Sequence, residues 1–232
     1  MITLHQLHMS PFNDKVKGQL YHKGINFEER FWGITELKQV KRFNPTGKLP
    51  VLEHDGRYIC DSTDIVHYIE SAFPEKPMIP RDQRLAGLMH AIEDWADESL
   101  YFYEMHLRFT TPGNAERNMQ RFAERENAFI RWLMPKVGPR SIRKTTYAQG
   151  VGRKSLEQLL LDVERHTKAV ADMLGENDWL LGEGVTLADL AVYCMFKALA
   201  DVDTANILIE KYPVVPAWMS RVAEITDPPV HR

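Results

Sequence analysis

The stretch Asn44-Pro45-Thr46-Gly47-Lys48-Leu49-Pro50-Val51-Leu52 is a turn rich in proline and glycine that runs directly into a short apolar segment. Gly47 can adopt a positive φ at little cost, which permits a tight turn. A proline is tolerated at the first position of a strand, where it disrupts the hydrogen-bond ladder least. The sequence therefore predicts a turn followed by a strand from Pro50, with Leu49–Pro50 as a candidate cis peptide bond.

A hairpin and a helix start follow this turn. Residues 50–53 and 57–60 have the composition of short strands, and Asp55-Gly56 between them favours a tight hairpin. Asp61-Ser62 then opens a segment, residues 62–73, whose apolar side chains recur with helical spacing. A hydroxyl and free backbone N–H groups at such a helix start can bind a carboxylate.

The residues before the turn predict a β-α-β unit. Residues 2–7 alternate as in a strand, residues 11–23 form a helix after Ser10, and residues 27–32 read as a second strand. A short helix is expected over 36–43. The order β-α-β-α-β-β-α fits a four-stranded sheet with helices on its faces.

The rest of the chain has a purely helical pattern. Three prolines within residues 73–80 cannot continue a helix and indicate a linker. We therefore expect an α/β domain over 1–75, a linker over 76–82 and an all-helical domain over 83–232. Within the latter, Thr186 and Asp189 form a capping box, and residues 135–152, with prolines and glycines among basic residues, predict a loop.

Composition narrows the functional classes. The 232-residue chain has a net charge of −3, which gives no electrostatic reason to expect nucleic acid as a partner. It shows no signal-peptide pattern and no apolar run long enough to span a bilayer, so a cytoplasmic protein without membrane contact is expected. Cys60 and Cys194 are far apart and match neither a disulfide scaffold nor a metal-binding spacing, so no metal site is predicted.

The order of these motifs resembles that of cytosolic glutathione transferases. The similarity is carried by Ser10-Pro11-Phe12-Asn13, the turn at 44–52, Asp61-Ser62 and Thr186-Leu187-Ala188-Asp189. It is closest to serine-type bacterial members similar to the theta, zeta and omega classes. The resemblance implies an α/β thioredoxin-like N-terminal domain plus an all-α helical-bundle C-terminal domain. It also implies glutathione as co-substrate, a homodimer and a role in detoxification.

The resemblance implies that Ser10 is the catalytic residue, donating a hydrogen bond to the glutathione sulfur. Asn13 can share or replace that role, because its amide also donates. By its position alone, Ser10 can equally be only the N-cap of the helix that follows. The absence of cysteine at both positions counts against thiol–disulfide exchange.

The same resemblance assigns the glutathione contacts. The backbone of Leu49, before Pro50, would pair with the cysteinyl part, and Lys48 could reach the glycine carboxylate, although a solvated lysine is an equal alternative. Ser62 would bind the γ-glutamyl carboxylate and Asp61 the α-amino group. A helix cap is the structural alternative for this pair.

A small hydrophobic electrophile would bind between the domains, near His8, Met9 and Phe12. An aromatic-rich segment would lie beside it, made of Tyr101, Phe102, Tyr103, His106 and Phe109. Packing is the alternative reading of those aromatic residues. The resemblance thus implies a glutathione S-transferase that activates the thiolate for attack on this electrophile. A non-catalytic glutathione carrier, or a glutathione-dependent isomerase, dehalogenase or peroxidase, remains open, because fold does not fix substrate.

Overall fold

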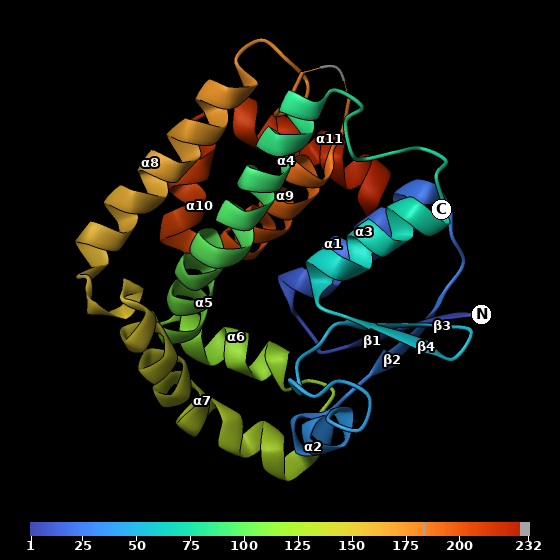
Figure 1. Ribbon diagram of the computed structural model, residues 1–232. Helices are drawn as coiled ribbons and strands as arrows, with labels where there is room; N and C mark the ends of the chain where they lie inside the picture. The colour runs from blue at the N-terminus through green and yellow to red at the C-terminus, as the bar shows by residue number, and fades with distance from the viewer. Residues whose placement is uncertain (183, 228–232) are drawn as a thin grey trace.

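The computed structural model describes residues 1–182 and 184–227 and contains one mixed sheet followed by a helical bundle (Figure 1). The strands are β1 (Ile2–Gln6), β2 (Glu28–Phe31), β3 (Val51–His54) and β4 (Arg57–Cys60). Their order in the sheet is β2-β1-β3-β4; β1 and β2 are parallel, and β3 is antiparallel to both of its neighbours. This is the predicted thioredoxin-like arrangement.

Helices α1 (Pro11–Lys23) and α3 (Ser62–Ala72) lie together on the face of the sheet nearest the bundle, and the short α2 (Leu37–Val40) lies on the other side (Figure 1). Gly24 ends α1 in the left-handed conformation, with φ 69°. Residues 73–82, which hold the three prolines, contain neither helix nor strand and lead to α4. We propose that residues 76–82 are the linker between an α/β domain and an all-helical domain.

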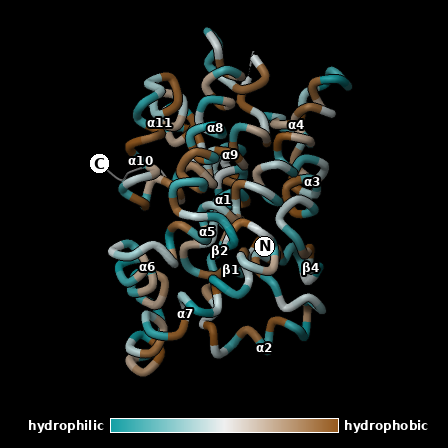
Figure 2. Tube along the Cα trace, turned by 90° about the vertical axis from the view of Figure 1, so that its left-hand side faces the viewer, coloured by the Kyte–Doolittle hydropathy of each residue, from teal (hydrophilic) through white to brown (hydrophobic). Residues whose placement is uncertain are grey.

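The C-terminal region is entirely helical, as expected. Its helices are α4 (Gln83–Trp95), α5 (Tyr101–Thr110), α6 (Asn114–Phe122), α7 (Ala128–Gln149), α8 (Leu156–Leu174), α9 (Leu187–Leu199), α10 (Asp203–Glu210) and α11 (Val214–Thr226). A π-helical turn, Ala96–Leu100, joins α4 to α5. In both overall views α9 lies in the middle of the bundle, and every residue of it except Lys197 is buried (Figures 1 and 2).

The predicted capping box at the start of α9 is confirmed, and it is part of a larger network. The buried Asp189 carboxylate accepts hydrogen bonds from the backbone N–H and hydroxyl of Thr186. It also accepts hydrogen bonds from the Leu180 backbone N–H and from Trp218 Nε1, at 2.8 and 2.9 Å. One side chain therefore ties α9 to α11 and to the loop before it.

The predicted loop over 135–152 is wrong, because α7 continues to Gln149 with Pro135 and Pro139 inside it. An internal proline costs a helix about 3 kcal/mol, so the sequence pattern favours a loop at these residues. Packing of α7 against α5 and α6 outweighs that cost. Figure 1 shows α7 following a bent path along these two helices.

Within the described ranges, no helix combines the length and the hydropathy needed to span a membrane.

Candidate active site

A cavity of about 510 Å³, which we call the polar cleft, lies where the 44–50 turn, the start of α3 and one side of α4 meet. It brings together six residues that the sequence analysis selected: Phe12, Lys48, Leu49, Pro50, Asp61 and Ser62. The Leu49–Pro50 peptide bond is cis, which the sequence identified only as a candidate. Residues far apart in the chain thus share one concave surface.

The 44–50 turn is held by the buried side chain of Asn44. Its Nδ2 donates to the Lys48 carbonyl oxygen at 2.8 Å, and its Oδ1 accepts from the Thr46 N–H at 3.1 Å. Gly47 has φ 67°, a conformation that glycine adopts without strain. These bonds fix the backbone of Leu49 at the edge of the cleft, where an extended peptide can pair with it.

Asp61 and Ser62 form the opposite side of the cleft. Asp61 has φ 77°, which is unusual for a residue other than glycine, and its Oδ1 caps α3 by accepting from the Thr63 N–H at 2.9 Å. Ser62 is the first residue of α3, so its hydroxyl and the free N–H groups of the first turn lie together. This is a suitable site for a carboxylate.

Behind this surface is a buried ionic network. The ammonium of Lys15, which is fully buried, lies 3.0 Å from Glu93 Oε1 and also binds the Asp97 carboxylate and the Thr63 hydroxyl. Burial alone would lower the pKa of Lys15, but the two carboxylates outweigh it and raise that pKa. Burial raises the pKa of Asp97 to about 6. The network connects α1, α3 and α4 below the cleft.

A second cavity of about 250 Å³, which we call the apolar cavity, lies on the other side of the β1–α1 loop. Its walls come from that loop and from α5, α6 and α7: Leu7, Met9, Ser10, Pro11, Tyr101, Glu104, Met105, Phe109, Met119, Phe122, Met134, Gly138, Ser141 and Ile142. The Phe12 ring, which lines the polar cleft, lies 4.7 Å from the Tyr101 ring, which lines the apolar cavity. The two cavities therefore adjoin at this pair.

Ser10 lies in the wall of the apolar cavity, directly before α1. Its backbone has the extended conformation of an N-cap, yet in the part of the chain that the structure describes its hydroxyl makes no capping hydrogen bond. Pro11, at the first helical position, needs no partner for a backbone N–H. The hydroxyl is thus available to a ligand.

Asn13 lies differently. Its side chain is buried, and its Nδ2 donates to the Leu7 carbonyl oxygen, which anchors the β1–α1 loop. Its Oδ1 has no hydrogen-bond partner among the described residues. Asn13 belongs to the lining of neither cavity, and its donor is already engaged.

Tyr103 and His106 do not line the apolar cavity, and their contact with an electrophile stays a prediction. The Tyr103 hydroxyl donates to Asp162 of α8 at 3.1 Å, and His106 Nδ1 lies 2.8 Å from the Thr146 hydroxyl of α7. The helix turns about 100° per residue, and the face that contacts the cavity carries Met105 together with Tyr101 and Phe109 of the aromatic-rich segment.

Glu104 is a functional candidate that the sequence analysis missed. This fully buried carboxylate lines the otherwise apolar cavity and accepts a hydrogen bond from Arg108 Nη1 at 3.0 Å. Burial raises the pKa of Glu104 to about 7, although Arg108 opposes the shift. A single glutamate on a helix carries no sequence signal of this kind, because the effect depends on burial.

Two models of protein families match this chain. Residues 4–77 match the family model described as glutathione S-transferase, N-terminal domain, and residues 129–225 match that described as glutathione S-transferase, C-terminal domain.

Two curated relatives match most of the chain. Protein LigF of Sphingobium sp. is 26% identical over 215 residues, covering 88% of this chain and 82% of LigF. The isoprene-epoxide–glutathione S-transferase of Rhodococcus sp. is 24% identical over 207 residues, covering 83% of this chain and 81% of the relative. The crystal structure of beta-etherase LigF superposes with a TM-score of 0.71 and 23% identity over 98% of this chain and 96% of that one.

Proposed function

Because this chain belongs to the glutathione S-transferase family, we propose that it binds glutathione in the polar cleft and uses the thiolate to attack an electrophile held in the apolar cavity. The observation that carries this proposal is the position of Ser10. Its hydroxyl is free of the helix cap and lies in the cavity wall, two residues from Phe12 in the cleft. The sulfur of a peptide bound in the cleft would meet the electrophile there.

The hydroxyl of Ser10 is energetically sufficient for thiol activation. A thiol with a pKa of about 8.5 is mostly protonated at pH 7, and only the thiolate is a good nucleophile. Lowering that pKa by about two units needs roughly 2.7 kcal/mol of preference for the anion. A hydrogen bond to a charged group contributes about 1.5–3 kcal/mol. The positive end of α1, directly after Ser10, adds to this.

In the proposed complex, the cleft holds the peptide by both ends. Ser62 and the N-terminus of α3 bind the γ-glutamyl carboxylate, while Asp61 faces the α-amino group. The Leu49 backbone pairs with the cysteinyl residue, and Lys48 binds the glycine carboxylate. Asn13 acts on this site by fixing the β1–α1 loop through Leu7, not by contact with the sulfur.

Two measurements on wild type, Ser10→Ala and Ser71→Ala test the proposal. Calorimetric titration gives the affinity for glutathione, and thiolate absorbance against pH gives the pKa of the bound thiol. We expect Ser10→Ala to bind glutathione but to return its thiol pKa toward about 8.5. Ser71, on the exposed end of α3, is a control for loss of a hydroxyl and should behave as wild type.

Three outcomes contradict the proposal in different ways. Binding without any pKa shift in wild type would favour the non-catalytic carrier. No binding at millimolar glutathione would reject the assignment of the cleft itself. An unchanged thiol pKa in Ser10→Ala would reject Ser10 as the activating donor.

Glu104 favours a second candidate function, cleavage of an ether by glutathione. The thiolate would form a carbon–sulfur bond as the carbon–oxygen bond breaks, and the Glu104 carboxyl would give its proton to the departing oxygen. Its pKa of about 7 keeps a large fraction of the Glu104 carboxyl protonated at neutral pH. In addition, the relative that is 26% identical to this chain is protein LigF, whose crystal structure is described as that of a beta-etherase. Comparing an aryl ether with an activated aryl halide tests this: Glu104→Gln should slow only the ether. Equal loss with both substrates would reject the role.

A further inference from the structure

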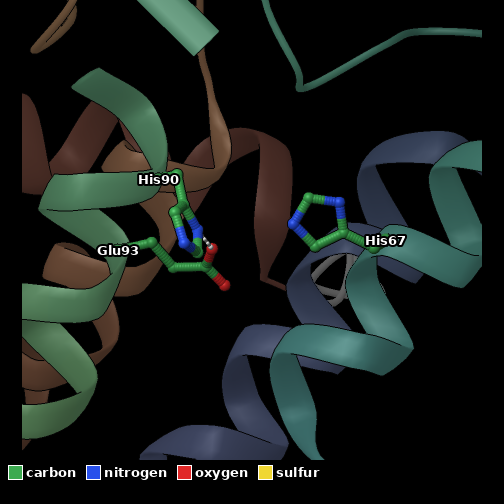
Figure 3. Close-up of side chains that lie close together, drawn as sticks. All are labelled: His67, His90 and Glu93. Carbon is green, nitrogen blue, oxygen red and sulfur yellow. Dashed lines mark ion pairs between the residues drawn. The ribbon is translucent and has the colours of Figure 1, made fainter. Parts of the chain in front are cut away.

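Helices α3 and α4 face each other beside the polar cleft, and three potential metal ligands meet between them (Figure 3). His67 comes from α3, whereas His90 and Glu93 are three positions apart on α4 and so share one face of that helix. The candidate ligand atoms of all three lie within 4.8 Å of one another. Figure 3 shows the His67 ring directed across the gap toward the other two side chains.

Glu93 supplies an independent indication of a missing partner. Its side chain is 1% exposed, and its Oε1 accepts from Lys15 Nζ and the Thr63 hydroxyl. Its Oε2, in contrast, has no hydrogen-bond partner among the residues that the structure describes. His90 Nδ1 lies 3.8 Å away, beyond hydrogen-bond distance. A buried carboxylate oxygen without a partner is costly, so it calls for an explanation.

The charges around Glu93 favour a cation. Lys15 supplies one positive charge between two carboxylates, Glu93 and Asp97, which leaves one negative charge uncompensated within that cluster. The polar cleft adds four more carboxylates, from Asp61, Asp64, Asp94 and Glu98. A concave surface with such a charge excess raises the local concentration of cations.

We propose that His67, His90 and Glu93 Oε2 bind a divalent transition-metal ion of the zinc class. Two imidazoles and one carboxylate form a ligand set that zinc accepts, with a fourth position left for water or another ligand. Tetrahedral bonds of about 2.0–2.1 Å would place the ligand atoms about 3.4 Å apart. His90 is 63% exposed and can rotate to close the difference.

This site goes beyond the proposed function, since thiolate attack promoted by Ser10 needs no metal. His90 and Glu93 also line the polar cleft, so the open coordination position is accessible from it. A bound ion would tie α3 of the sheet region to α4 of the bundle. Binding to the folded state alone would then raise the thermal stability of the whole chain.

Cobalt(II) is a suitable probe, because its visible absorption reports coordination number and ligand type, and zinc should displace it. We expect one cobalt ion per chain in wild type, with the intense bands of a four- or five-coordinate site. His67→Ala and His90→Ala should each lower the affinity by about 100-fold or more, given that loss of an outer-shell partner alone costs 10–100-fold. His22→Ala, at the end of α1, removes an imidazole elsewhere and should bind as wild type.

A second readout covers the case in which a variant is destabilised. Zinc should raise the melting temperature of wild type and of His22→Ala, and EDTA should reverse the rise, while both site variants should show no rise. The proposal is overturned if wild type binds no cobalt at submillimolar concentration. It is also overturned if His67→Ala binds as tightly as wild type, which would leave only adventitious binding by α4.

Discussion

The polar cleft and the apolar cavity adjoin at Phe12 and Tyr101, yet they are built by opposite means. One side of the cleft is backbone held by short-range bonds, such as those of Asn44 and Asp61, and charged side chains of α4 and a buried ionic network complete it. The cavity is made of side chains from three helices and one loop, with a single carboxylate among them. The turn that lines the cleft depends on local backbone geometry, whereas the cavity depends on how three helices pack.

The largest expected effect tests the network below the cleft. Lys15→Met leaves Glu93 and Asp97 as buried carboxylates without their ammonium, and removal of one partner of a buried pair costs about 3–5 kcal/mol. Denaturant unfolding should show this loss. The more exposed Lys17, paired with Asp14 at 3.1 Å, is the control, and Lys17→Met should cost less than about 1 kcal/mol. Equal losses would show that the network is not what stabilises this region.

The next effect concerns the carboxylate of the apolar cavity. The folded-state pKa of Glu104, about 7, lies above its ordinary value of 4.5, so the folded state holds the proton more tightly. The free energy of unfolding therefore falls as pH rises from about 4.5 to about 7, by up to about 3 kcal/mol.

Glu104→Gln should remove this pH-dependent part of the free energy of unfolding. The stability of the variant relative to wild type should therefore increase as pH rises across that window. Chemical denaturation at several pH values measures the difference, and Glu157→Gln, on the exposed first turn of α8, is the control. A difference that does not vary with pH would mean that Glu104 is not held protonated by the cavity.

A smaller effect, on ligand affinity, should show that the polar cleft and the apolar cavity bind different ligands. Ser62→Ala removes one hydroxyl from the proposed carboxylate site, and a hydrogen bond to a charged group contributes about 1.5–3 kcal/mol, or about 10–150-fold in affinity. Calorimetry should show this loss for glutathione, while an apolar fluorescent probe should bind the apolar cavity as before. If both ligands weaken together, the two cavities are not independent.

The smallest effect tests the helical wall of the cavity. Alanine is favoured over glycine within a helix by about 0.5–1 kcal/mol. At Gly138 the added Cβ would meet Met119 Sδ at 2.6 Å, so the Met119 side chain, which lines the cavity, must shift.

Gly138→Ala should therefore raise the KM for a bulky electrophile without changing glutathione affinity. Gly87→Ala, on α4, has no atom within 4 Å of the added Cβ and should be stabilised without a change in KM. Equal KM values in both variants would place the electrophile outside this cavity.

The same contrast explains which structural predictions were confirmed. The turn at 44–50 and the Asp61-Ser62 helix start depend on local backbone preferences, so their sequence pattern identified them and the structure brings them together. Tyr103 and His106 were chosen for their chemistry, but the rotation of α5 directs them to α8 and α7. The part of α7 that lines the apolar cavity was not predicted as a helix, because Pro135 and Pro139 favour a loop unless packing against neighbouring helices offsets their cost.

The sequence by itself determined the order of strands and helices in the N-terminal region, the helical character of the rest, the resemblance to the family and the backbone turn of the cleft, because turns, caps and apolar periodicity act within a few residues. Tertiary structure alone decided the burial of Glu104, the pairing of Lys15 with two carboxylates and the meeting of His67 with His90 and Glu93. Desolvation and through-space contact between separate helices create these properties, and neither leaves a local pattern in the chain.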